Sequence, residues 1–310
     1  MVKVRKFLMK KAMKMRFGIF FNPNAGDGNA EELAKKMQEK FEKKGYQADF
    51  LTAPDPEKAI KKVKEAVDEY DGIVSIGGDG SLNIVGTAFV QAGKAIPLGI
   101  IPGGTINNFA RRWHSPLDEE EAMDVIIDGH QRNVGIAACQ DREKAIISSF
   151  TFGTFADISN EVRQSEKQKL GLIVYPLKAL KQLGKKRSYP VEVQANNYQE
   201  KLKVWFSLAT TTHSIGGRPY IDTDYDKLHV SILHNMRFRK LVQLVRLIFT
   251  GRVKDSDSLT YLETDFLTLK PLTDKKIYSR IDGDKGPALP LTVEFLADFV
   301  PLYVPNKQNQ

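Results

Sequence analysis

The sequence has little cysteine and no long apolar run. Cys139 is the one cysteine among 310 residues, which excludes an intramolecular disulfide framework and favours a reducing compartment. It follows the apolar residues 136–138, so we predict a buried structural thiol and not a nucleophile. No stretch approaches the roughly 18 apolar residues of a membrane span. We see no internal repeat and no low-complexity linker, so the chain is expected to fold as ordinary globular domains.

Acidic residues are too few to balance the basic ones. The formal charge is +8, with 46 Lys and Arg against 38 Asp and Glu, and this favours anionic partners: nucleotides, nucleic acid or an anionic membrane face. The basic residues are not interleaved with aromatics in a recognisable nucleic-acid motif, so we expect no nucleic-acid partner. Residues 1–15 are basic but too interrupted for a signal peptide. We interpret them as a tail, with an amphipathic surface helix or a true start at Met15 as alternatives.

The N-terminal half alternates between predicted strands and helices. Strands are expected at 17–21, 46–52, 72–76 and 96–101, and Asp55-Pro56 and Asp118 are typical of helix starts. This order predicts a parallel, doubly wound α/β sheet covered on both faces. The length favours two domains.

Beyond about residue 140 short strands dominate, separated by turn residues, which predicts an all-β C-terminal sandwich. Two basic helical segments interrupt the pattern, at 170–183 and 236–253. Helices of this kind either lie on anionic membrane surfaces or pack on a core with a solvated basic face, and we leave both open. The predicted strands are 145–152, 189–194, 202–210, 228–233, 258–269 and 291–296.

The residues 77–83, Gly-Gly-Asp-Gly-Ser-Leu-Asn, join a buried strand to a helix that we expect to begin at Leu82. Glycines at such a corner let the backbone approach a bulky anion, and the N–H groups of the helix start then point at it. Asp79 would repel phosphate by itself, so it is expected to hold Mg²⁺ or to position an attacking hydroxyl. The alternative is a tight turn with a surface carboxylate. Two more glycine loops, at 22–29 and 102–105, also leave carboxyl ends of predicted strands, where ligands of such sheets bind.

Several motifs in order resemble the diacylglycerol kinase catalytic family, in particular the bacterial soluble lipid kinases. The resemblance runs from Phe17 to the C-terminus. It rests on FNPNAGDG at 21–28, GGDGSLN at 77–83, PGGTINNFARR at 102–112, residues 169–171 with Tyr175, Ser214 to Gly217, and IDGD at 281–284.

The resemblance implies a basic tail at 1–15, a nucleotide-binding domain at 16–139 and a β-sandwich carrying the lipid site at 140–310. The last residues are expected to pack back near the domain junction. The resemblance further implies ATP and Mg²⁺, with Asp79 in the magnesium and hydroxyl-positioning network and Asp284 as the general base. The implied ATP contacts are Asn22, Thr52, Gly77, Gly78, Asp79, Gly80, Ser81, Leu82, Asn83, Gly104, Thr105 and Asn108.

The chain departs from the family pattern at three places. Asp284 stands where the family has glutamate, so the carboxylate is one methylene shorter. Asn108 stands where many members have aspartate, which removes a negative charge beside Asp79. Tyr225 stands at the aspartate of the family's structural metal site, so we expect that metal to be lost, or displaced onto Asp222 and Asp224.

We therefore expect an ATP- and Mg²⁺-dependent lipid kinase that phosphorylates diacylglycerol or a related membrane lipid. It would act in the cytoplasm, bound peripherally to the anionic inner face of the membrane. The alternatives are a lipid- or nucleotide-binding protein with weak or no kinase activity, and another GGDG kinase such as an NAD kinase. Soluble family members are often dimers, but no heptad or apolar edge marks an interface here.

Overall fold

The computed structural model describes residues 15–23, 28–153, 188–212, 214–215, 218–219, 226–234 and 258–306. These residues form two compact units, one of 1–134 with 298–310 and the other of 135–297. Two strands, β5 (Gln131–Cys139) and β17 (Leu291–Tyr303), run from one unit into the other. Several predicted segments lie outside the described residues: the tail at 1–14, both basic helical segments, and the residues Asp222, Asp224 and Tyr225.

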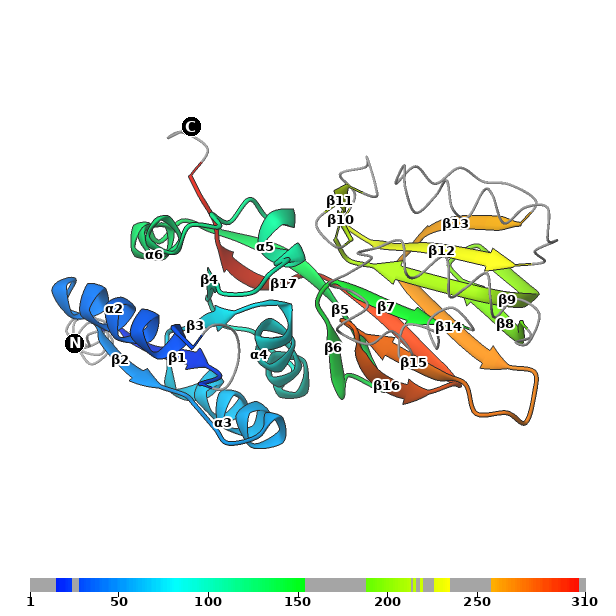
Figure 1. The fold of residues 1–310 in the computed structure, drawn as a ribbon, viewed down its shortest axis with the longest axis horizontal. Coiled ribbons are helices and arrows are strands. Elements are labelled where there is room, and N and C mark those ends of the chain that lie inside the picture. Colours follow the sequence, from blue (N-terminus) through cyan, green and yellow to red (C-terminus); the bar gives the residue numbers. More distant parts are fainter. Residues whose placement is uncertain are drawn as a thin grey trace, which may run out of the picture. The chain divides into compact units, whose positions relative to one another are not determined.

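The first unit contains a parallel sheet with the strand order β2-β1-β3-β4 (Figure 1). All four predicted strands are present, as β1 (Arg16–Phe21), β2 (Gln47–Phe50), β3 (Gly72–Gly77) and β4 (Leu98–Pro102). The chain places β2 on one side of β1 and then β3 and β4 on the other. The carboxyl ends of β1 and β3 are therefore adjacent at the point where the strand order reverses, which is where ligands bind in open α/β sheets.

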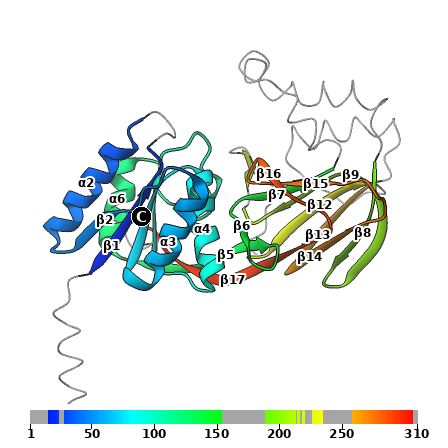
Figure 2. The same cartoon turned by 90° about the horizontal axis from the view of Figure 1, so that it is seen from below.

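Helices pack on the sheet of the first unit. α2 (Ala30–Lys43) and α6 (Glu119–Asp128) share one buried cluster with alternate residues of β1. Figure 2 shows the two helices side by side from below. Leu33, Met37 and Phe41 of α2 are each at most 2% exposed, which confirms the predicted helical spacing. α3 (Pro56–Glu69) packs against α4 (Asp79–Ala92). The short α5 (Asn108–Arg112) follows the third glycine loop.

The predicted helix starts are confirmed at two positions. The Asp55 carboxylate accepts a hydrogen bond from Lys58 N at 2.9 Å ahead of Pro56, and the same bond lowers the pKa of Asp55. The Asp118 carboxylate accepts from Glu120 N and Glu121 N, both at 3.0 Å. Each carboxylate satisfies backbone donors that the first helical turn leaves unpaired.

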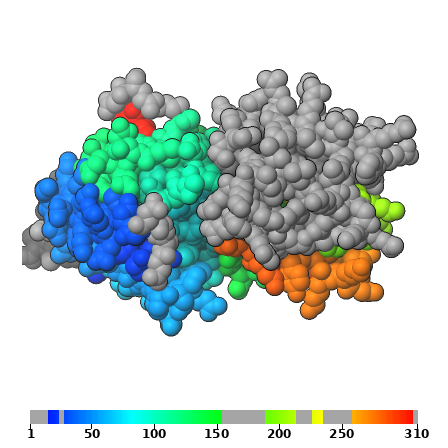
Figure 3. Space-filling model, in the orientation of Figure 1, coloured from blue at the N-terminus to red at the C-terminus, as the bar shows by residue number. Residues whose placement is uncertain are grey.

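The second unit is rich in β-structure. Its strands run in the order β16-β15-β7-β9-β8-β14-β17, and β12 pairs with β9 and β13. Its buried core contains Phe150, Phe152, Val193, Val230 and Leu267, and the orange residues after 258 reach the surface in Figure 3. The bounds are β6 Lys144–Ile146, β7 Ser149–Phe152, β8 Tyr189–Ala195, β9 Tyr198–Thr210, β10 Ser214–Ile215, β11 Arg218–Pro219, β12 Leu228–His234, β13 Leu259–Thr264, β14 Phe266–Pro271, β15 Tyr278–Ile281 and β16 Asp284–Ala288.

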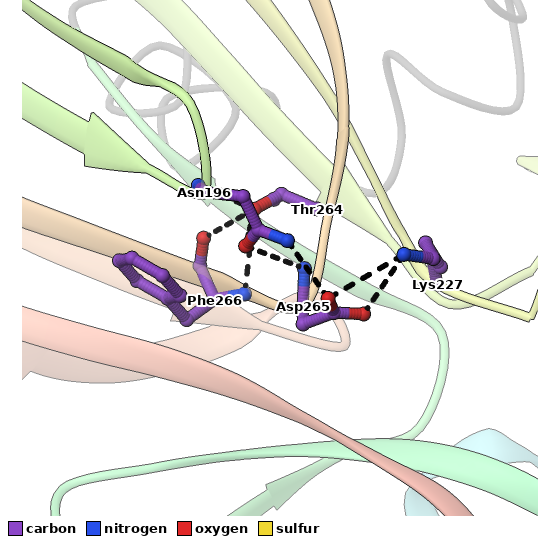
Figure 4. A network of polar contacts seen from close by, with 5 residues as sticks. All are labelled: Asn196, Lys227, Thr264, Asp265 and Phe266. Carbon is purple, nitrogen blue, oxygen red and sulfur yellow. Dashed lines mark hydrogen bonds and ion pairs between the residues drawn. The ribbon is translucent and has the colours of Figure 1, made fainter.

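The predicted strand at 258–269 is two strands that pair with different neighbours. β13 pairs with β12, whereas β14 pairs with β8 and β17. The break lies at Asp265, where side chains hydrogen-bond to the local backbone (Figure 4). Asn196 Oδ1 accepts from Asp265 N at 3.2 Å, and Thr264 Oγ1 donates to Phe266 O at 2.8 Å. Such bonds compete with strand pairing, and apolar periodicity does not reveal them. The prediction of one strand at 145–152 is also wrong, since β6 and β7 occupy it.

Candidate functional site

The glycine loop after β3 is the start of a helix. α4 begins at Asp79, three residues before the predicted start at Leu82, with Gly78 at the N-cap position and no side chain capping it. The backbone N–H groups of this first turn carry the positive end of the helix dipole. Gly80 is exposed, and a Cβ placed there would meet no atom within 4 Å. The turn is therefore open to an anion such as a phosphate group.

The loops after β3 and β4 are packed backbone against backbone. Gly103 N donates to Gly77 O at 3.0 Å. A Cβ on Gly104 would lie 2.6 Å from the Cα of Gly78, closer than real Cβ atoms approach backbone. Gly77 has φ +140°, a value that favours glycine. Glycine is therefore required at positions 77 and 104 by the contact between the two loops. Gly80 has a different role, because it leaves the first turn of α4 open.

Asp79 connects the two loops. Its Oδ2 accepts a hydrogen bond from Asn108 N at 3.0 Å, and its Oδ1 accepts from Phe109 N at 3.2 Å. These are the first two residues of α5, so Asp79 caps that helix from a different loop. Asn107, in the left-handed region with φ +53°, donates from Nδ2 to Gly104 O at 2.7 Å. The third loop is thus held at both ends. Sequence reasoning assigned Asp79 to the metal and missed this capping role, because the partners are about 30 residues away.

The other predicted ATP contacts of the first unit lie along the same edge of the sheet. Asn22 directly follows β1, and Thr52 follows β2 with its carbonyl accepting from Lys62 Nζ at 3.1 Å. Thr105 is exposed in the third loop. Ser81, Leu82 and Asn83 are buried within α4, at 8%, 2% and 9% exposure. Their role as ATP contacts stays a prediction.

The chemistry of this edge fits a magnesium ion that a nucleotide brings with it. Mg²⁺ is usually held by one or two carboxylates together with substrate phosphates and waters. Asp79 would supply one such carboxylate, whose oxygens also accept from Asn108 N and Phe109 N. Asn108 adds no charge. Within the described residues no group of three or more His, Cys, Asp or Glu side chains could hold a metal without such phosphates.

In the second unit the IDGD motif is a hairpin turn. Ile281 and Asp284 pair at the ends of β15 and β16, and Asp282 and Gly283 between them have φ +51° and +94°. Positive φ at both central residues is typical of a type I′ turn, for which Asp-Gly is a favoured sequence. Asp284, the first residue of β16, is exposed. The prediction from sequence included neither β15 nor β16.

The two aspartates of this turn have different surroundings. Asp282 Oδ1 accepts from Ser148 N at 2.8 Å, Ser148 Oγ at 3.0 Å and Ser149 N at 2.9 Å, and Oδ2 accepts from Ile147 N at 3.0 Å. A carboxylate so occupied is unsuited to take a proton from a substrate. Asp284 is the exposed carboxylate of the motif.

Comparison with known proteins shows similarity to diacylglycerol kinases. The sequence profile of the diacylglycerol kinase catalytic domain matches residues 16–139. The match covers less than half of the 310-residue chain. It is 26% identical over 298 residues to a diacylglycerol kinase of Staphylococcus epidermidis, covering 94% of this chain and 93% of the relative. The identity to a diacylglycerol kinase of Staphylococcus aureus is also 26%, over 300 residues, covering 95% and 94% of the two chains.

Solved structures share the fold. A crystal structure of a diacylglycerol kinase from Bacillus anthracis superimposes with a TM-score of 0.71 at 16% identity, covering 96% of this chain and 98% of that one. A second crystal structure from the same organism gives a TM-score of 0.77 at 20% identity, covering 95% and 96%. The mixed α/β first unit and the β-rich second unit are thus features of known diacylglycerol kinase structures, as the sequence predicted.

Among the residues that the structure describes, none of the helices combines the length and apolar composition needed to cross a bilayer. Cys139 is 1% exposed, and burial raises the pKa of its thiol to about 12, which confirms the predicted structural role.

Proposed function

We propose that this protein transfers the γ-phosphate of ATP, with Mg²⁺, to the hydroxyl of diacylglycerol or a related membrane lipid. The first turn of α4 and the loop after β4 bind the phosphates through backbone N–H groups. Asp79 helps to hold the metal, which neutralises charge on the transferring group, while its bonds to α5 keep the third loop in place. Asp284 accepts the proton of the lipid hydroxyl. We further propose that the first unit is doubly wound and that the second is a sandwich carrying the lipid site.

The observation that carries this proposal is the contrast between the two carboxylates of the IDGD turn. Asp282 is occupied by three backbone N–H groups and a hydroxyl, whereas Asp284 is exposed two residues later at the start of β16. A general base needs an accessible carboxylate on a firmly placed element. The shorter side chain of aspartate then requires the lipid hydroxyl to approach closer to the strand than it would with glutamate.

The test is phosphate transfer from radiolabelled ATP to mixed lipid vesicles, with mass spectrometry to identify the lipid that gains phosphate. Asp284→Asn keeps the size of the side chain but removes the proton acceptor, so we expect lipid phosphorylation to fall by about 10²- to 10⁴-fold. Full activity of Asp284→Asn would refute the assignment of the base. Nucleotide binding without any labelled lipid, across a broad panel, would favour a binding protein.

The edge of the second unit has the composition of a membrane-binding surface. Tyr278 is 43% exposed on β15, and Lys285 Nζ lies 4.5 Å from the centre of its ring. Arg280 pairs directly opposite Lys285, and like charges so placed repel unless an anion binds them. Tyrosine and lysine are both favoured at the headgroup level of membranes. We propose that this hairpin contacts the anionic inner face of the cytoplasmic membrane.

Cosedimentation with vesicles containing phosphatidylglycerol tests this contact without ATP. Lys285→Glu reverses one charge, which we expect to cost about 2 kcal/mol, or roughly thirtyfold in binding. Lys203→Glu, at an exposed position of β9, is the control and should bind almost as the wild type does. Equal losses in both variants would show that only net charge matters.

A homodimer stays a prediction, which light scattering of the purified protein would decide.

A further inference from the structure

Asp282 sits where three successive backbone N–H groups converge. The turn between β6 and β7 directs the amides of Ile147, Ser148 and Ser149 at one carboxylate, and Asp282 N donates back to Ser149 O at 2.8 Å. Ile147 and Ser148 are 2% and 4% exposed. Buried amides of this kind need acceptors, and Asp282 supplies them from a residue more than 130 positions later in the chain.

The same turn also holds the end of β9. Thr211, 3% exposed, donates from Oγ1 to Ile147 O at 2.5 Å, and its N–H donates to Ser148 O at 3.2 Å. Three residues further on begins β10, which contains the first two residues of the Ser214 to Gly217 motif. The turn at 147–149 therefore ties together two segments: the hairpin with Asp284 and the chain that leads into this second motif.

We propose that Asp282 is a positioning residue for the transfer step, acting through the turn at 147–149. It fixes the hairpin whose next strand begins with Asp284, at the turn that also accepts two hydrogen bonds from Thr211 after β9. The inference rests on the proposed role of Asp284 as general base. Without the Asp282 carboxylate, the hairpin keeps its pairing to β7, but the direction in which Asp284 leaves the turn is no longer set. Misplacement of a catalytic group by about 1 Å can cost about 10²-fold in rate.

The test is a pair of variants at Asp282 with a matched pair elsewhere in the unit. In Asp282→Asn, one oxygen can still accept from Ser148 and Ser149, but the amide NH₂ faces Ile147 N–H. Asp282→Ala loses every bond. We expect kcat for lipid phosphorylation to decrease from wild type to Asn to Ala, by about 10²-fold at the end of the series. The KM for ATP should not change, because the ATP contacts lie in the first unit.

The control is Asp265, another carboxylate that accepts side-chain hydrogen bonds at a strand corner of the second unit. It accepts from Asn196 Nδ2 at 2.8 Å and pairs with Lys227 (Figure 4). Asp265→Ala and Asp265→Asn should lower the melting temperature without lowering kcat at a temperature where all variants are folded. Thr211→Val, which removes the hydroxyl bonded to Ile147 O, should lower kcat as Asp282→Asn does.

The outcomes separate this inference from the proposed function. If Asp282 were only structural, kcat per folded molecule would be equal in all Asp282 variants, and the inference would be wrong. If Asp284→Asn were fully active, the base assignment would fail whatever Asp282 did. Normal kcat at Asp282→Ala together with an inactive Asp284→Asn would refute the positioning role alone.

Discussion

Asp79 is assigned two tasks, capping α5 and holding magnesium, and mutagenesis can separate them. Asp79→Ala removes a carboxylate that accepts from Asn108 N and Phe109 N. Loss of a capping side chain costs about 0.5–2 kcal/mol, and hydrogen bonds to charged groups contribute about 1.5–3 kcal/mol each when well buried. Asp79 is only half-buried, so we expect a loss of about 2 kcal/mol. For a unit of this size that is about 4–8 °C in melting temperature.

Asp79→Asn distinguishes the two tasks. The amide oxygen can accept one of the two N–H groups, so part of the stability should return. The negative charge does not return, so the dependence of activity on Mg²⁺ should shift to higher concentration, with activity well below that of the wild type even when melting is nearly normal. The measurements are thermal melting by circular dichroism and initial rates of lipid phosphorylation across a magnesium titration.

Asp118→Ala is the matched control for these measurements. Asp118 caps α6 by accepting from two backbone N–H groups at 3.0 Å, in the same unit and outside the glycine loops. Its loss should lower the melting temperature by a similar amount and leave the rate per folded molecule unchanged. If Asp79→Asn restored activity and stability in parallel, Asp79 would be a cap and not a metal ligand, and the proposed role in magnesium binding would be refuted.

Two further predictions follow from packing. Gly104→Ala would place a Cβ 2.6 Å from the Cα of Gly78, so the two loops must separate. We expect this variant to bind ATP more weakly, as measured by calorimetry. The control is Gly80→Ala, which should leave the loop contact intact because no atom lies within 4 Å of the added Cβ. Burial raises the pKa of Cys139 to about 12, so the thiol should stay protonated and unreactive towards maleimide at pH 8 until the protein unfolds, and rapid labelling of the folded protein would contradict this placement.

Much of the first unit could be predicted from the sequence, because its signals are local. The apolar spacing of Leu33, Met37 and Phe41 and the caps at Asp55 and Asp118 each depend on residues within one or two helical turns. The hairpin at 281–284 could not be predicted in the same way. β16, Asp-Lys-Gly-Pro-Ala, has neither apolar alternation nor β-branched residues. It is held by its partner strand and by Ser279 Oγ, which donates to Pro287 O at 2.7 Å.

The roles of the aspartates could not be fully predicted from the sequence either. Motif reasoning identified Asp79 and Asp284 by their neighbours in sequence, and it had no reason to consider Asp282. In the structure, Asp79 and Asp282 do similar work: each is a carboxylate in a glycine turn that accepts backbone N–H groups from a segment distant in sequence. Each glycine turn is thus fixed to a second segment through a charged acceptor. The proposed base at Asp284 needs such a fixed turn because its side chain is short, so the loss of one methylene relative to glutamate makes the anchor at Asp282 more important.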